Sequence, residues 1–301
     1  MIISASRRTD IPNYYSEWLI NRIRIGFVDV RNPVVNDLIY RIPLNPDVVD
    51  AFVFWTKNPK PIMKHLGEIS EKYPFYFQFT ITPYGKDVER NIPEKGEMIN
   101  VFKELSKKIG RERVVWRYDP IFFSDKYSVK YHQEKFREMA EALSPWTGKC
   151  VFSILDMYSK DLRYSTADED TLHIAECIGK TTERLGMKAE TCSEATDFSQ
   201  FGINRGHCID KDILERICGY RLDVQKDKSQ RVCCGCMTSI DIGQYNTCRN
   251  GCEYCYAVSG DECRRQTHDP NSSLISGCPG QRDRIVERKI KSFRQMQTSL
   301  F

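Results

Sequence analysis

Short runs rich in apolar and β-branched residues recur along the chain. Runs of this length and composition are typical of strands. Their nearly continuous apolar character is typical of strands that are covered on both faces of a sheet. The pattern predicts strands at 2–6, 51–55, 75–81, 113–118, 150–155 and 187–191, and a weaker strand at 238–243.

Segments with helical periodicity separate these runs. We predict helices at 12–24, 60–72, 97–109, 128–143, 168–185 and 282–297. Residues 27–44 are expected to add a hairpin. Strands that alternate with helices form parallel βαβ units, so the chain is expected to have an α/β fold.

Polar residues follow almost every predicted strand, as in "SRRTD" after the first and "TKNP" after the second. In a barrel the carboxyl ends of the strands converge on one mouth, where active sites lie. We therefore predict a (β/α) barrel or partial TIM-like barrel that forms a single domain over residues 1–301. The alternative is that these loops are polar only because loops lie at the surface.

Charge and hydropathy bear on whether the protein binds nucleic acid, spans a membrane or is secreted. Lys and Arg number 45 against 41 Asp and Glu, a net charge of +4 that is too mild to indicate nucleic-acid binding by itself. The sequence has no apolar run near the roughly 18 residues that a membrane span needs. The N-terminal charge order is the reverse of that in a secretion signal. We expect a cytoplasmic protein with no membrane partner.

The number and distribution of the cysteines indicate metal binding or redox chemistry. The chain has 13 cysteines, and the first 149 residues contain none of them. An odd count and the absence of an export signal argue against a disulfide framework. Cysteines crowded into residues 192–263 therefore indicate a region that binds a metal or carries out redox chemistry.

The stretch "NTCRNGCEYCYA" places Cys248, Cys252 and Cys255 at C-x3-C-x2-C spacing. Thiolates are soft ligands that suit iron–sulfur clusters or zinc. A structural zinc site takes four protein ligands, so three ligands in one short loop leave a position open. This layout favours a catalytic metal centre. The competing interpretation is that the three cysteines are free thiols.

This spacing, with Tyr254 directly before the last cysteine, resembles the signature of the radical S-adenosylmethionine superfamily, and its flanks resemble the spore photoproduct lyase branch. The resemblance implies a 4Fe–4S cluster on the three cysteines, with S-adenosylmethionine bound to the fourth iron. It implies cleavage to a 5′-deoxyadenosyl radical that abstracts a hydrogen atom from the substrate. It also implies that Tyr254 packs beside the adenine, and that a ferredoxin or flavodoxin supplies the electron.

The position of the motif departs from that family, in which it follows the first strand of the barrel rather than the last. A circular permutation explains the difference, because the termini of a compact domain often lie close together. It predicts that strand 2–6 pairs in parallel with strand 238–243, with helix 282–297 packed outside them. The whole chain also resembles an uncharacterised family that opens with "ISASRRTDIP" and supplies no activity.

A second set of thiols flanks the weak seventh strand. Its members are Cys192, Cys208, Cys234 and Cys236. Four thiols near one barrel mouth suit a second 4Fe–4S cluster or a zinc ion, and scattered buried thiols are the alternative. The pattern places Cys150, Cys177 and Cys218 in the core. It assigns no role to Cys263 or Cys278.

Charged residues after the strands complete the predicted mouth. The residues expected to contact the cofactor are Asp10, Lys57, Arg117 and Tyr254. Those expected to contact the substrate are Arg7, Arg8 and Asp119. Asp10 precedes Ile-Pro, so a helix cap is a competing interpretation. Arg117 and Asp119 could instead form a structural ion pair.

The sequence thus favours a radical S-adenosylmethionine enzyme whose substrate, a small molecule or a nucleic acid, is not identified. One alternative is a zinc-stabilised module that binds nucleic acid, attached to a barrel. Another is an iron–sulfur protein that transfers electrons or senses redox state. No catalytic side chain beyond the ligands is assigned.

Overall fold

The computed structural model describes residues 1–156, 164–259 and 267–295. Its centre is an eight-stranded sheet in the order β10-β1-β4-β5-β6-β7-β8-β9, in which every neighbouring pair is parallel. The strands are β1 (Ile2–Ala5), β4 (Ala51–Thr56), β5 (Phe75–Thr80), β6 (Val114–Ile121), β7 (Lys149–Ile154), β8 (Lys188–Thr191), β9 (Asn204–Arg205) and β10 (Ile240–Asp241). All seven predicted strands are therefore confirmed, and β9 is an addition.

The predicted pairing of the first and last strands is also confirmed. Ile3 lies opposite Ile240 and Ser4 opposite Asp241 in a parallel ladder. β10 and β9 are the two edges of this sheet in the described part of the chain, so these strands form an open sheet rather than a closed barrel. The α/β class is confirmed. The sheet is consistent with a partial barrel or with a Rossmann-like domain, and a complete barrel is not confirmed.

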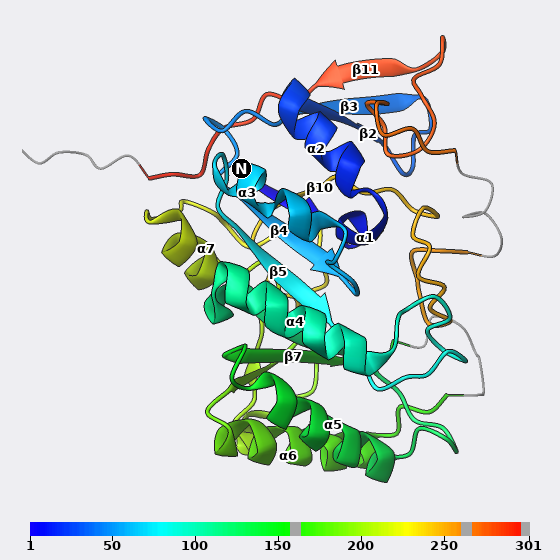
Figure 1. Ribbon diagram of the computed structural model, residues 1–301, viewed down its shortest axis with the longest axis vertical. Coiled ribbons are helices and arrows are strands. Elements are labelled where there is room, and N and C mark those ends of the chain that lie inside the picture. Colours follow the sequence, from blue (N-terminus) through cyan, green and yellow to red (C-terminus); the bar gives the residue numbers. More distant parts are fainter. Residues whose placement is uncertain (157–163, 260–266, 296–301) are drawn as a thin grey trace, which may run out of the picture.

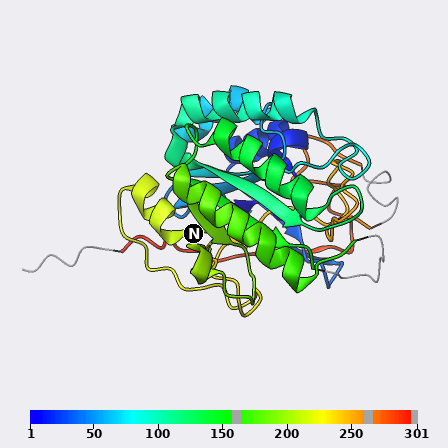
Figure 2. The same ribbon diagram turned by 90° about the horizontal axis from the view of Figure 1, so that it is seen from below.

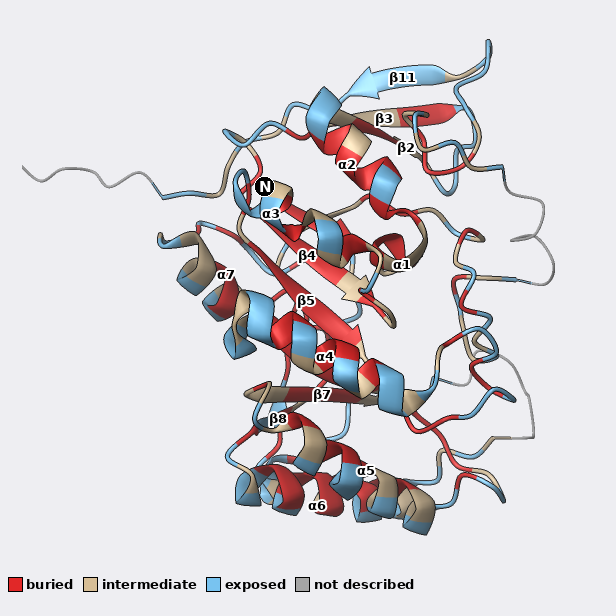
Figure 3. Cartoon of the chain, viewed as in Figure 1, coloured by how far each residue is buried: buried red, intermediate tan, exposed pale blue. Residues whose placement is uncertain are grey.

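One face of the sheet is covered by helices, which bury their apolar sides against it (Figures 1 and 2). They are α1 (Ile11–Tyr14), α2 (Ser16–Ile25), α3 (Leu66–Ser70, preceded by the 3-10 turn Ile62–His65), α4 (Lys95–Ile109), α5 (Val129–Leu143) and α6 (Asp168–Arg184). Shorter 3-10 turns lie at Arg111–Arg113 and Ser199–Phe201. Figure 3 shows the buried inner and exposed outer sides of these helices, the pattern that the periodicity predicts.

The opposite face of the sheet is covered by residues 206–237, which we call the inner strap. It includes α7 (Lys211–Cys218) and packs against Ile2, Val53 and Tyr76. The Tyr76 hydroxyl and the Gln78 amide both donate to the carbonyl of Cys208, which fixes the strap to β5. Since alternate side chains of a strand point to opposite faces, the apolar strands contact both layers.

A small second sheet contains β2 (Phe27–Arg31), β3 (Leu38–Pro43) and β11 (Arg284–Glu287). β2 and β3 form the antiparallel hairpin predicted for 27–44. The helix predicted at 282–297 is wrong over its described residues, because Arg284–Glu287 pairs in parallel with Leu38–Arg41. The β-branched pair Ile285 and Val286 suits this edge, and tertiary pairing overrides the helix propensity of the surrounding charged residues.

Candidate functional site

The polar segments that follow the strands meet at the carboxyl edge of the large sheet. Asp10, after β1, is buried and ties three of them together. One carboxylate oxygen accepts the Asn13 N–H at 3.1 Å and caps α1. The other accepts the Lys57 N–H at 2.8 Å and the Asn250 amide at 3.1 Å. The cap predicted as the competing interpretation is confirmed, and contact with a cofactor stays a prediction.

Asp241, at the end of β10, joins the two ends of the chain. Its carboxylate accepts the hydroxyls of Ser4 and Ser6, and the backbone N–H of Arg7 at 2.8 Å. Its contact with the Arg8 guanidinium is longer, at 3.4 Å. These bonds hold the start of the three-cysteine loop beside the residues that follow β1.

Cys248, Cys252 and Cys255 lie on the loop that leaves β10, and all three are half-buried. Burial raises the pKa of Cys252 to about 12, while the nearby Lys57 acts in the opposite direction. Burial also raises the pKa of Cys248 and of Cys255. The loop is anchored near Cys252 by an antiparallel bridge between that residue and Glu89. Burial thus shields the three thiols in part from water and opposes their ionisation.

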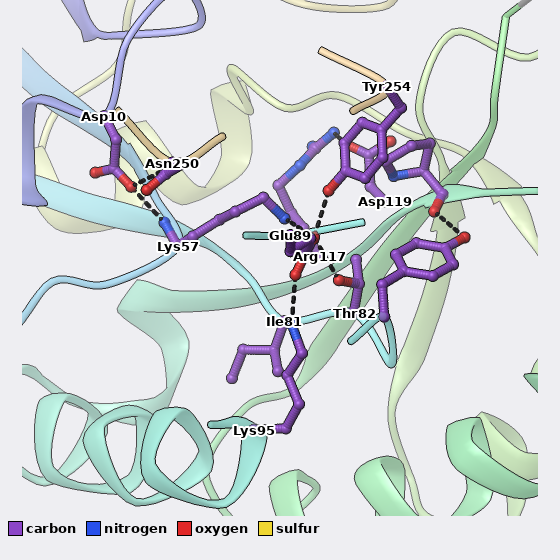
Figure 4. A network of polar contacts seen from close by, with 12 residues as sticks. Asp10, Lys57, Ile81, Thr82, Glu89, Lys95, Arg117, Asp119, Asn250 and Tyr254 are labelled. Atoms are coloured by element: carbon purple, nitrogen blue, oxygen red, sulfur yellow. Dashed lines mark hydrogen bonds and ion pairs between the residues drawn. The ribbon is translucent and has the colours of Figure 1, made fainter. Parts of the chain in front are cut away.

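Glu89 is the centre of a buried ionic network beside this loop (Figure 4). Its carboxylate contacts the ammonium of Lys57 at 2.7 Å and that of Lys95. The Thr82 hydroxyl donates to it at 2.7 Å, and the Tyr254 hydroxyl donates as well. Burial opposes its ionisation, but the two ammonium groups outweigh that effect and lower the pKa of Glu89 to about 2.

Tyr254 is held between this network and an aromatic cluster. Its ring lies 6.0 Å from that of Tyr84 and 6.2 Å from that of Phe122, both tilted. The Lys57 ammonium lies 5.6 Å from the centre of the Tyr254 ring. The residue before the last cysteine is therefore fixed by protein contacts on several sides.

The second set of cysteines is brought together under the carboxyl edge. The sulfur atoms of Cys192 and Cys208 lie 3.2 Å apart. Cys208 is also in side-chain contact with Cys236, and Cys236 with Cys234. The four residues come from the end of β8 and from both ends of the inner strap. The structure brings these four thiols into a chain of pairwise contacts, and their binding of a cluster or of zinc stays a prediction.

Two arginines predicted at the mouth lie against this second set. Arg117, from β6, is buried and donates to the Cys208 sulfur at 2.7 Å. It also forms the predicted ion pair with Asp119, whose other oxygen accepts the Ser153 hydroxyl. The Arg7 guanidinium contacts Cys236. Trp55 lies between the arginines, with its ring 5.2 Å from Arg7 and 5.0 Å from Arg117.

The sequence analysis did not identify Glu89 or Lys95. Glu89 lies between β5 and α4, and Lys95 is the first residue of α4. The charged residues of this segment resemble those of any exposed loop. The Glu89 carboxylate is buried by partners from separate segments, among them Tyr254 of the three-cysteine loop. The nearest sequence signal is the rise in charged residues around "GKDVERNIP", which is too common to select one residue.

The remaining cysteines follow the prediction only in part. Cys150 and Cys177 are buried in the main core, as predicted, whereas Cys218 is half-buried at the edge of the inner strap. Cys278 is exposed, and Cys263 lies outside the described residues. In the described part no group of three or more Cys, His, Asp or Glu side chains is arranged around a common point as for one metal ion. No helix in the same part is long and apolar enough to cross a bilayer.

Comparison with known proteins gave one result. Residues 2–257 match the family described as a domain of unknown function, DUF1848. The match runs from β1 through the three-cysteine loop and so includes both sets of thiols. Searches of curated proteins and of solved structures found no match. Since the match covers most of its length, the chain belongs to the DUF1848 family.

Proposed function

We propose that this protein is a radical S-adenosylmethionine enzyme. The observation that carries the proposal is the C-x3-C-x2-C loop at the carboxyl edge of a parallel sheet, beside a buried charged network. That edge is where α/β proteins bind their ligands. The parallel pairing of β1 with β10 supports the further proposal that the fold is a permuted form of a (β/α) barrel.

The chemistry of the donor set fits a 4Fe–4S cluster. Cys248, Cys252 and Cys255 supply three thiols from one short loop. The ligands of such a cluster each bind a different iron, so their sulfur atoms stand farther apart than those around a single ion. The lack of a single-ion arrangement among the described residues is therefore compatible with a cluster. Cys248, Cys252 and Cys255 would hold it, and the open position would accept S-adenosylmethionine.

When bound, the cluster and S-adenosylmethionine would supply a 5′-deoxyadenosyl radical that takes a hydrogen atom from the substrate. The chain's own residues prepare the site. Lys57 and Lys95 place two positive charges against one Glu89 carboxylate, which leaves a net positive charge next to Cys252. The Lys57 ammonium acts against the effect of burial on the pKa of Cys252, and so toward thiolate, the form that binds metal.

Asp10, Asn250 and Tyr254 orient the loop. Asp10 and Asn250 fix its first half to the ends of β1 and β4. The contacts of Tyr254 with Glu89 and Tyr84 fix its second half and exclude water from that side. A reducing compartment such as the cytoplasm suits thiols that must stay unoxidised. The substrate, whether a small molecule or a nucleic acid, is not assigned.

The test uses protein purified without oxygen and reconstituted with iron and sulfide. Dithionite, or a ferredoxin or flavodoxin, supplies electrons, and the product measured after adding S-adenosylmethionine is 5′-deoxyadenosine. We expect cleavage in the parent, loss of both cluster absorbance and cleavage in Cys252→Ala, and no change in Cys278→Ala, whose cysteine is exposed.

Two other outcomes would favour the competing functions. Zinc in place of iron at the three-cysteine loop would favour a zinc-stabilised module that binds nucleic acid. Iron and sulfide without cleavage, with dithionite and with either protein donor, would favour an electron carrier or redox sensor.

A further inference from the structure

The inner strap is fixed to the sheet at its two ends by the same group of side chains. Cys208 stands near the start of the strap and Cys234 and Cys236 near its end, while Cys192 follows β8. Backbone bonds bring the two ends together, with Met237 N–H donating to the Ile209 carbonyl at 3.1 Å. Four thiols that are far apart in sequence therefore share one buried place, which free core cysteines have no physical reason to do.

We propose that Cys192, Cys208, Cys234 and Cys236 bind one thiophilic metal ion, Zn²⁺, and that this ion clamps the inner strap to the sheet. The site is separate from the three-cysteine loop and does not depend on the function proposed for that loop. Four thiolates from the chain would close the coordination shell, as in structural zinc sites.

The four sulfur atoms do not surround a common point as they stand, but their short contacts are nearer to the spacing around a single ion than to that around a cluster. Sulfur atoms around a tetrahedral zinc stand about 3.8 Å apart, because each Zn–S bond is about 2.3 Å long. Cys192 and Cys208 are separated by 3.2 Å, and Cys208, Cys236 and Cys234 follow in successive contact. Zinc binding would require side-chain rotations that bring these four sulfurs around one point, whereas a four-iron cluster would require all four sulfurs to separate.

The electrostatic surroundings suit a site with negative charge. Zn²⁺ with four thiolates carries a net charge of −2. The guanidinium groups of Arg7 and Arg117 lie against these thiols, and the carboxylates near them are Asp241 and Asp119 respectively. One terminal nitrogen of Arg7 is buried without a hydrogen-bond partner in the described part of the chain. A buried guanidinium nitrogen without a partner is costly unless an anionic group lies beside it.

The sulfur atoms also receive the hydrogen bonds that metal thiolates need. Arg117 donates to the Cys208 sulfur at 2.7 Å, and the Ile209 N–H donates to the Cys236 sulfur at 3.4 Å. Such outer contacts orient ligands and stabilise their charge.

Gly235 allows the close turn between two of the ligands. A Cβ atom there would stand 2.0 Å from Nδ1 of His207. The His207 ring also contacts the Gly235 carbonyl at 2.8 Å. The C-G-C arrangement therefore lets both thiols approach the start of the strap.

The experiment measures zinc, iron and sulfide in a full-length variant with Cys248, Cys252 and Cys255 all changed to Ala, so that the first set contributes nothing. We expect about one zinc per chain, as for a closed four-thiolate site, and no sulfide. Adding Cys234→Ser and Cys236→Ser should lower zinc at least tenfold. Adding Cys233→Ser instead, a neighbouring half-buried thiol, should leave zinc unchanged.

Cobalt keeps the proposal testable where the serine variants do not fold. Replacement of zinc by Co²⁺ in the variant that retains the second set should give the intense thiolate-to-cobalt and tetrahedral absorption bands of four thiolate ligands. The proposal is overturned by absence of metal, by iron with sulfide, by zinc retained in the Cys234→Ser, Cys236→Ser variant, or by a cobalt spectrum without thiolate bands. None of these readouts uses S-adenosylmethionine cleavage, so they are independent of the proposed activity.

Discussion

The Lys57 ammonium lies 2.7 Å from the Glu89 carboxylate, and both groups are largely buried. The backbone N–H of the same lysine donates to Asp10, 2.8 Å away. A single residue therefore links the cap of α1 to the ionic network under the three-cysteine loop (Figure 4). We infer that the stability of the loop depends in part on the buried Glu89 carboxylate, which is 1% exposed.

Glu89→Gln should strongly destabilise the protein. It leaves Lys57 and Lys95 buried without their shared carboxylate, and breaking a buried ion pair costs about 3–5 kcal/mol. The free energy of unfolding from urea denaturation measures the loss. The matched control is Glu97→Gln, since Glu97 contacts Lys60 at 3.2 Å on the surface and such pairs contribute about 0–1 kcal/mol. Equal losses in both variants would show that the network at Glu89 is not desolvated.

Tyr254→Phe removes one hydroxyl that donates to the Glu89 carboxylate and keeps the ring. Hydrogen bonds to charged groups contribute about 1.5–3 kcal/mol, so we expect a loss of unfolding free energy in that range. Tyr131→Phe is the control, because its hydroxyl donates to the neutral Pro83 carbonyl at 2.9 Å. Its loss should be nearer 1 kcal/mol. A smaller loss for Tyr254→Phe than for the control would contradict the assigned contact.

The strands and most helices could be predicted because their apolar periodicity reflects burial on a sheet. The predicted helix at 128–143, for example, is observed at Val129–Leu143. The segment 282–297 could not be predicted in this way. Its charged residues favour a helix, but its position is decided by an edge of β3 and by Asp50, which accepts the Phe293 N–H at 2.8 Å. Partners that are distant in sequence leave no local pattern.

The residues of the candidate site also differ in whether a local sequence pattern could predict them. Cysteine spacing identified the three-cysteine loop, and the position of thiols at strand ends identified the second set. Glu89 became visible only in three dimensions, because its burial depends on Lys57, Lys95 and Tyr254 from separate segments. No local sequence pattern predicts the ionic partners of a carboxylate in a charged loop.

Gly243→Ala should disturb the junction between β10 and the residues after β1. A Cβ atom at this position would lie 2.0 Å from the Ser6 hydroxyl oxygen and 2.6 Å from the Ser6 Cβ. Overpacking of this kind costs about 1–3 kcal/mol and would displace the start of the three-cysteine loop. Urea denaturation and iron content after reconstitution should both fall.

Gly67→Ala is the control for that substitution. Gly67 lies in α3, and an added Cβ would have no atom within 4 Å. Removal of a glycine from a helix should raise stability by about 0.5–1 kcal/mol without changing iron content. A Gly243→Ala protein as stable as the parent would mean that Ser6 moves aside without cost.

His132 should make stability fall with acid. Its ring is fully buried, with Nδ1 2.8 Å from the Tyr118 hydroxyl and Nε2 3.0 Å from the Phe122 carbonyl. Burial lowers its pKa to about 4, so the folded protein keeps it neutral where the unfolded chain, with a pKa near 6.5, takes up a proton. The unfolded state then binds more protons between these values, and stability present above pH 6.5 is lost as the pH falls toward 4.

Between pH 7 and pH 5, His132 should lower the free energy of unfolding by about 2 kcal/mol. The interval from the unfolded pKa of about 6.5 down to pH 5 is about 1.5 pH units, and each unit contributes about 1.36 kcal/mol. Other groups also titrate, so the measured quantity is the difference between the parent and His132→Asn in urea denaturation at the two pH values. His132→Asn should be less stable than the parent at pH 7, and the gap should narrow by that amount at pH 5. An equal stability difference at pH 7 and pH 5 would mean that His132 takes up a proton as readily in the folded protein as in the unfolded chain. The aromatic rings of Tyr84, Tyr118 and Phe123 around His132 make that protonation physically unfavourable.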